Sequence, residues 1–290
     1  MGGWTETYRG MVHAWECDMV EHFTVAYYFD RFGDACMNLL AAMDIGPSQI
    51  TSGGKALATF DCHTRYLKEL RGGDIMHINS CVIEHTDKGV TLGHKLINSV
   101  TGELCSTLEQ KLRFMDLTSR RGIEFPDRLR KLAESLKADW DQPLRETRQA
   151  VADDGFFASA LDTVKPWEID ILGHLTVSCY VHRFSAANNQ AMAAVGLTPQ
   201  YAAEANVGFS TFEFQAKFVR ELRSGDRVNV RSTVASIGGS SMRLVHRLYH
   251  TDSGELSAEL SQFGVQLDKT LRRPSPLPDA IREKFNALRP

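Results

Sequence analysis

An aspartate is followed four residues later by a histidine at two places in the chain, Asp18 with His22 and Asp170 with His174. Each pair stands directly before a segment whose apolar residues recur at three- and four-residue spacing, which predicts a long helix. A carboxylate at a helix start can serve as a base or a nucleophile, and the amides of the first helical turn can hold a developing oxyanion. This pattern therefore favours attack on a carbonyl group. The structural alternative is that the aspartate only stabilises the helix dipole, which is worth about 0.3–1 kcal/mol.

The two Asp–His segments belong to a repeat that covers nearly the whole chain. One offset, the 152 residues between Asp18 and Asp170, holds throughout without a visible insertion. It also relates Arg31-Phe32 to Arg183-Phe184, Glu69-Leu70-Arg71 to Glu221-Leu222-Arg223, Gly73-Asp74 to Gly225-Asp226, and Pro126-Asp127 to Pro278-Asp279. A repeat of this length indicates one duplicated domain. We predict repeat one at residues 1–125, a charged helical linker at 126–149, and repeat two with a C-terminal helix at 150–290.

The elements expected in each repeat are one strand, one long helix and about four antiparallel strands. Residues 5–15 are typical of a first strand, and residues 60–67 and 212–219 alternate between apolar and polar side chains, as strands do. Residues 71–74 contain glycine and aspartate and are predicted to form a turn, and the connections at 86–89 and 101–103 are short enough for antiparallel hairpins. Wrapping the sheet around the helix would bury the apolar faces of both. We therefore expect an α+β fold with two such repeats.

Composition excludes several classes of function. The chain has 290 residues, a net charge of −3 and 43% hydrophobic residues, which gives no electrostatic reason to bind nucleic acid or an anionic membrane. Its six cysteines form no C-x-x-C pair, and no histidine pair has metal-ligand spacing backed by a carboxylate. We expect a cytoplasmic protein without disulfides or metal, and without a membrane or nucleic-acid partner.

The helix-start motif carries a family resemblance. Repeat two contains Asp170, Gly173 and His174 followed by Tyr180, which resembles the Asp-x-x-Gly-His…Tyr pattern of hotdog-fold acyl-CoA thioesterases in the 4-hydroxybenzoyl-CoA thioesterase-like superfamily. Repeat one keeps the pattern except for Glu21 in place of the glycine. The resemblance implies a tandem (double) hotdog fold, in which each repeat wraps an antiparallel sheet around a long central helix. It also implies hydrolysis of an acyl-CoA thioester.

A second resemblance concerns repeat one alone. The segments His63-Thr64-Arg65-Tyr66-Leu67-Lys68-Glu69, Gly73-Asp74 and 101–110 are similar to betainyl-CoA thioesterase domains. This likeness implies a small or polar acyl group, such as betainyl. Repeat two departs from it, with Gln215 where repeat one has His63 and Ser261 where repeat one has Glu109.

The resemblance also implies roles for individual residues. The catalytic candidates are Asp170, His174, Asp18, His22, His63 and Glu109, and the oxyanion or substrate-binding candidates are Gly173, Leu175, Thr176 and Arg65. No separate cofactor is expected, since coenzyme A is part of the substrate. We expect the helix-start loop of repeat two to combine with polar strand residues of repeat one in a single site. Thr24 and Thr176 are expected to cap their helices, and His94 and His246 to be buried, hydrogen-bonded histidines.

Two other functions remain open at this point. One is an enoyl-thioester hydratase or dehydratase of the hotdog fold, although its Asn-Pro-x-His-x-Asp signature is absent from the sequence. The other is a non-catalytic acyl-CoA-binding module, for which Glu21 is an argument because one copy of the motif has already changed. A homo-oligomer of the two-repeat unit is also open.

Overall fold

The computed structural model describes residues 3–18, 20–143, 145–148 and 150–288. The chain divides into two compact units, and each is discontinuous in sequence. Unit 1 contains Met1–Arg145 together with Ile169–Ser178, and unit 2 contains Glu146–Glu168 together with Cys179–Pro290. The short segment that carries Asp170 therefore groups with the first half of the chain. The repeat boundaries at 125 and 150 stay a prediction from sequence similarity.

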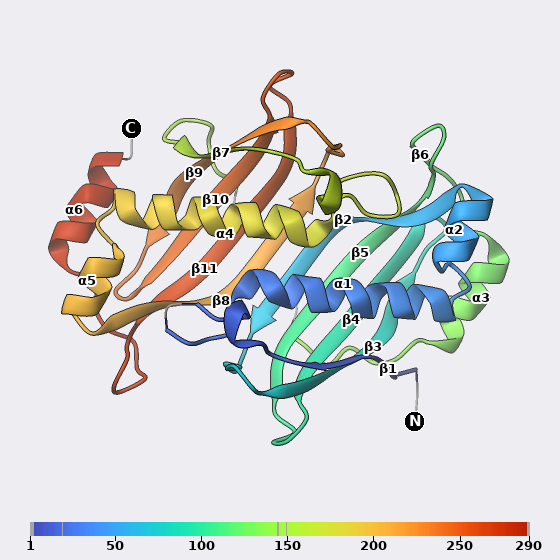
Figure 1. Cartoon of the computed structure of the whole chain (residues 1–290), viewed down its shortest axis with the longest axis horizontal. Helices are drawn as coiled ribbons and strands as arrows, with labels where there is room; N and C mark the ends of the chain where they lie inside the picture. The colour runs from blue at the N-terminus through green and yellow to red at the C-terminus, as the bar shows by residue number, and fades with distance from the viewer. Residues whose placement is uncertain (1–2, 19, 144, 149, 289–290) are drawn as a thin grey trace. The chain divides into compact units, whose positions relative to one another are not determined.

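Unit 1 contains a five-stranded antiparallel sheet with one long helix packed on it. In strand order the sheet runs β1-β3-β4-β5-β2, and the two-residue strand β6 pairs with β5. Its elements are β1 (Thr5–Met11), the 3₁₀ turn η1 (Ala14–Glu16), α1 (Val25–Ala42), α2 (Pro47–Gly53), β2 (Lys55–Tyr66), β3 (Ile75–His85), β4 (Gly89–Asn98), β5 (Leu104–Asp116), β6 (Arg121–Gly122) and α3 (Asp127–Ser135). Helix α1 contacts β1, β3 and β4, and Figure 1 shows it lying across these strands.

Unit 2 repeats this arrangement. Its strands run in the order β8-β11-β10-β9-β7, which is the order of unit 1 read from β2 to β1. The elements are β7 (Phe157–Thr163), η2 (Pro166–Glu168), α4 (Val177–Ala194), α5 (Pro199–Glu204), β8 (Val207–Phe218), β9 (Arg227–Ile237), β10 (Ser241–His250), β11 (Leu256–Asp268) and α6 (Asp279–Leu288). Buried Ala191, Met192 and Val195 at the end of α4 and just beyond it pack against Val234 and Leu244 of the sheet.

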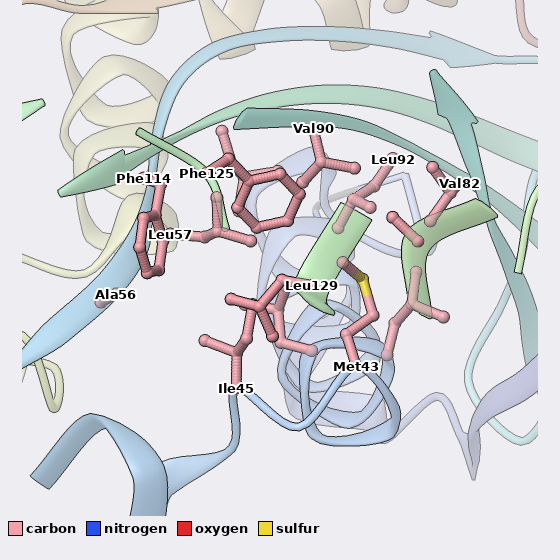
Figure 2. Packing of buried hydrophobic residues seen from close by; sticks show 14 of the residues in the cluster. Met43, Ile45, Ala56, Leu57, Val82, Val90, Leu92, Phe114, Phe125 and Leu129 are labelled. Atoms are coloured by element: carbon pink, nitrogen blue, oxygen red, sulfur yellow. The ribbon is translucent and has the colours of Figure 1, made fainter. Parts of the chain in front are cut away.

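The core of unit 1 lies between α1 and one face of its sheet. Leu39, Leu40 and Met43 occur at helical spacing and are buried, which explains why this segment forms an amphipathic helix against the strands. Figure 2 shows how Phe114 and Phe125 gather with Met43 in this cluster. Burying each such side chain stabilises the fold by roughly 1.5–3 kcal/mol.

The segment between the repeats contains less helix than expected. We predicted a helical linker over 126–149, but α3 ends at Ser135. Beyond it, Lys137 forms a β-bridge with Val82, and the Trp140 ring covers Gly93 so closely that a Cβ there would lie 2.6 Å from it. The contacts that these residues make with the sheet outweigh their propensity to form a helix.

Two further features concern the chain as a whole. All six cysteines, which lie within the described residues, are free thiols. Among the helices that the structure describes, none has the length and apolar character needed to cross a membrane.

Candidate active site at the helix-start loops

The loop before α1 is folded around the side chain of Asp18. Its carboxylate oxygen Oδ1 accepts hydrogen bonds from the amides of Val20 and His22, at 2.9 and 3.0 Å. The backbone closes the same turn, because the Asp18 amide donates to the His22 carbonyl at 2.8 Å and the Glu21 amide donates to the Asp18 carbonyl at 3.0 Å. Asp18 itself is exposed.

The loop before α4 has the same hydrogen bonds around Asp170. Oδ1 accepts from the amides of Leu172 and His174, at 2.8 and 3.5 Å. The Asp170 amide donates to the His174 carbonyl at 2.9 Å, and the Gly173 amide donates to the Asp170 carbonyl at 3.0 Å. The repeated aspartates therefore hold two loops of one conformation, which we call the Asp18 loop (residues 18–22, of which 19 lies outside the described residues) and the Asp170 loop (residues 170–174).

The residue before the histidine has a left-handed backbone in both loops. Gly173 has φ of 81° and Glu21 has φ of 62°. Glycine adopts this conformation freely, whereas a residue with a Cβ does so at a cost of roughly 1–2 kcal/mol. A Cβ built at Gly173 would meet only a guanidinium nitrogen of Arg120, at 3.7 Å, among the described atoms within 4 Å. The space beside the Asp170 loop is therefore open.

The two histidines have different partners. His174 Nδ1 lies 3.5 Å from Asp170 Oδ2, so carboxylate and imidazole stand side by side. His22 Nε2 instead lies 3.2 Å from Glu69 Oε2. Glu69 was not among the residues predicted for this site. Its signal was present, since Glu69 and Glu221 are one of the pairs related by the repeat offset.

The start of α1 differs from the expected cap. Thr24 makes no side-chain cap hydrogen bond, so the prediction that its hydroxyl caps the helix is wrong. Its backbone amide donates to the carbonyl of Glu16 at 2.9 Å, and an ion pair between Glu16 and Arg31 holds that turn against the helix. The amides of Val25 and Ala26 remain as first-turn donors without an intrahelical acceptor.

The corresponding positions before α4 are Leu175 and Thr176. Leu175 is buried, with 1% of its surface exposed, and it forms a β-bridge with Ile169. This bridge closes the Asp170 loop at its base. Thr176 directly precedes α4, which begins at Val177.

The face of the sheet that carries α1 can be identified from one ring contact. Phe32 of α1 lies 6.0 Å from the ring of His94 on β4, measured between ring centroids. His94 pairs with Leu108 on β5, and Leu108 pairs with Thr64 on β2. Since directly paired residues point to the same side of a sheet, His94, Leu108 and Thr64 face the helix.

His63 and Glu109 are brought together, but on the opposite face. They are paired across β2 and β5, one residue away from the helix-facing pair, and Glu109 also pairs with Gly93, which Trp140 covers. Arg65 shares this face because it lies two residues from His63 on the strand. The sheet therefore separates these three polar side chains from the face that carries α1.

The Asp170 loop lies on the helix-carrying face. Leu172 packs against the hydrophobic cluster that α1 forms with β2 and β5. Its carbonyl accepts a hydrogen bond from Arg120 Nη1 at 3.2 Å. These two contacts explain why Ile169–Ser178 groups with unit 1. The sharing of one site between the repeat-two loop and repeat one stays a prediction, and His63, Arg65 and Glu109 lie on the face opposite α1.

His94 and His246 are buried and hydrogen-bonded, as the sequence predicted. Ser80 Oγ lies 2.6 Å from His94 Nδ1 and 2.6 Å from Thr7 Oγ1, and Ser232 lies 2.6 Å from His246 Nδ1 in the other repeat. Burial lowers the pKa of both histidines to about 3. Both imidazoles are therefore neutral near pH 7. No cluster of three or more possible metal ligands occurs in the described part of the chain.

Comparison with known proteins gives a consistent result. The sequence profile of the thioesterase-like superfamily matches residues 12–132 and 164–285, which is one match for each repeat. The chain is 28% identical over 125 residues to the betainyl-CoA thioesterase of Pseudomonas aeruginosa, covering 43% of this chain and 79% of that protein. It is 27% identical over 143 residues to the L-carnitine dehydrogenase/betainyl-CoA thioesterase of Agrobacterium fabrum, covering 49% of this chain and 27% of that protein.

Among solved structures, a putative oleoyl thioesterase from Lactobacillus plantarum has a similar fold. The TM-score is 0.72 at 14% identity, over 91% of this chain and 96% of that one. This likeness covers both repeats and shows the fold alone.

Proposed function

The chain belongs to the thioesterase-like superfamily, and from that premise we propose that it hydrolyses the thioester bond of an acyl-CoA at the Asp170 loop. The observation that carries this proposal is the placement of Asp170. Its carboxylate is fixed by the amides of Leu172 and His174, stands beside the His174 imidazole, and directly precedes α4.

In the proposed reaction Asp170 acts as a general base. It takes a proton from a water molecule, whose oxygen attacks the thioester carbonyl and forms a tetrahedral oxyanion. Collapse of this intermediate breaks the carbon–sulfur bond, and the proton held by Asp170 passes to the departing thiolate. The products are a carboxylic acid and the free thiol of coenzyme A. His174 orients the Oδ2 atom of Asp170 through its Nδ1 atom.

The oxyanion donors are proposed at the first turn of α4. The amides of Gly173 and His174 already donate to Asp170, which leaves them poorly placed for a substrate. The amides of Val177 and Ser178 begin the helix and have no intrahelical acceptor. The helix dipole adds a positive field at that end, which stabilises the oxyanion. Gly173 leaves room for the substrate carbonyl to approach.

Three differences favour Asp170 over Asp18. Asp170 is partly buried, with 25% of its side chain exposed, whereas Asp18 is exposed, so Asp170 lies in the less solvated position. The Asp18 loop carries the exposed side chain of Glu21 where the Asp170 loop has Gly173. In addition, His22 Nε2 lies 3.2 Å from Glu69 Oε2, whereas His174 Nδ1 lies 3.5 Å from Asp170 Oδ2.

Each repeat is, on this proposal, one hotdog domain. The support is the shared order of one strand, one 18-residue helix and four further antiparallel strands in both halves of the chain. We place the activity in the cytoplasm, because six free cysteines suit a reducing compartment.

The acyl group is proposed to be small and polar, with betainyl as the first candidate. The two betainyl-CoA thioesterase relatives support this choice.

The test is thiol release from a panel of acyl-CoAs by the purified full chain, with Asp170→Asn as the matched control. Betainyl-CoA is compared with tert-butylacetyl-CoA, which has the same shape without the positive charge. We expect release of free thiol that depends on Asp170, with betainyl-CoA preferred over its neutral analogue. No release from short, polar, aromatic or long acyl-CoAs would overturn the hydrolase, and would favour binding without catalysis. Addition of water to an enoyl-CoA without thiol release would favour the hydratase.

A further inference from the structure

The turn after β5 has an unusual residue at its end. Asp116 Oδ1 accepts from the amides of Thr118 and Ser119, at 3.2 and 2.7 Å, and these bonds shape the turn. The turn ends at Arg120, which has a left-handed backbone with φ of 55°. Glycine or asparagine suits this conformation better than arginine. The same left-handed backbone recurs at Arg272, so it belongs to the turn and does not by itself assign a role to the side chain.

The side chain of Arg120 reaches the Asp170 loop. Its Nη1 atom donates to the carbonyl of Leu172 at 3.2 Å, and its Nη2 atom lies 3.7 Å from where a Cβ of Gly173 would be. The peptide group between Leu172 and Gly173 is thus held at both ends, because its amide donates to the Asp170 carbonyl at 3.0 Å. Rotation of this peptide group would disturb both the turn and the carboxylate that the loop presents.

We propose that Arg120 is a positioning residue of the reaction, which fixes the Leu172–Gly173 peptide group and thereby the direction of the Asp170 carboxylate. This inference rests on the proposed function and extends it to repeat one, since the base and its positioning arginine come from different repeats. Displacing a catalytic group by about 1 Å costs up to roughly 100-fold in rate. The same displacement should change substrate binding, and therefore KM, much less than it changes kcat.

The chain contains a matched control. Arg272 occupies the same place in repeat two, also with φ of 55°, after a turn in which Asp268 Oδ1 accepts from the amides of Thr270 and Leu271 at 2.8 Å each. The variants Arg120→Gly and Arg272→Gly make the same chemical change in the same backbone conformation. Only the first removes the contact with the Leu172 carbonyl.

The experiment measures kcat, KM, melting temperature and amide exchange for both variants of the full chain. For Arg120→Gly we expect kcat to fall about 10- to 100-fold with KM unchanged within about twofold. The melting temperature should be unchanged or higher, because glycine relieves the left-handed backbone. Amides of residues 171–174 should exchange faster. Arg272→Gly should keep the wild-type kcat and the wild-type exchange of residues 171–174.

Two results would overturn the inference. One is a wild-type kcat, or wild-type exchange at residues 171–174, in Arg120→Gly. The other is an equal loss of kcat in Arg272→Gly. If the wild-type chain released no thiol from any acyl-CoA, the proposed function would fail. The exchange measurement would still decide whether Arg120 holds the loop.

Discussion

Gly173 and Glu21 occupy the same left-handed position in two loops with the same hydrogen bonds, with φ of 81° and 62°. The duplicated backbone has therefore kept its shape although one copy has gained a side chain. A left-handed residue with a Cβ costs roughly 1–2 kcal/mol. Replacing it with glycine removes this cost but offsets part of the gain, because glycine has the larger conformational entropy in the unfolded chain. The first repeat carries this strain, and the second does not.

This difference predicts opposite effects for two substitutions. Glu21→Gly should raise the free energy of unfolding by about 1 kcal/mol, and Gly173→Ala should lower it by about the same amount. Gly173→Ala should also reduce turnover, since its methyl group occupies the space beside Asp170. Urea denaturation checks the first claim and thiol release the second. A stability loss in Glu21→Gly would show that the left-handed backbone is not the source of strain.

A second prediction concerns pH and the buried histidine of each repeat. The pKa of His94 is about 3 in the folded protein, because burial disfavours its charged form, whereas its ordinary value is 6.5. Between these values the unfolded chain binds a proton that the folded chain does not. The stabilisation is therefore complete above pH 6.5 and falls by about 1.4 kcal/mol per pH unit below it.

Denaturation at several pH values between neutrality and pH 5 measures this slope. His94→Gln, which can still hydrogen-bond to Ser80, should reduce the slope of unfolding free energy against pH by the contribution of one histidine. His246→Gln should do the same in the other repeat, as its pKa is also about 3. An unchanged slope in both variants would mean that these histidines do not titrate on unfolding in the way their burial requires.

A third prediction follows from the two faces of the sheet. His63 and Glu109 are paired on the face opposite α1, whereas the Asp170 loop packs on the face that carries the helix. We expect His63→Ala and Glu109→Gln to lower kcat far less than the roughly 100-fold loss expected of an acid–base group. His63 is 5% exposed, so thermal melting must first show that the variant is folded. A loss of kcat comparable to that of Asp170→Asn would show that these residues belong to the site.

The sequence predicts the duplication and the helix-start motif well, because both are local patterns repeated at one offset. It places Asp170 next to His174 for the same reason. The face of the sheet on which His63 lies depends on strand pairing and on which face the helix covers. Neither can be read from the alternation of apolar and polar residues in a single strand. Glu69 and Arg120 contact the loops across 47 and 52 residues of sequence, respectively, so only the fold reveals their partners, His22 and Leu172. At Thr24 the expected cap is missing, and the Tyr27 amide donates to the carbonyl of Thr24 instead of its hydroxyl.

The most direct test of the account compares Asp170→Asn with Asp18→Asn. Asparagine keeps an oxygen that can accept from the loop amides, so both variants should fold, and thermal melting checks this. We predict that Asp170→Asn lowers kcat/KM for the preferred acyl-CoA by about 10²- to 10⁴-fold, as loss of a general base does. Asp18→Asn should stay close to the wild-type value. A larger loss in Asp18→Asn, or equal losses in both variants, would contradict the assignment of the working site to the Asp170 loop.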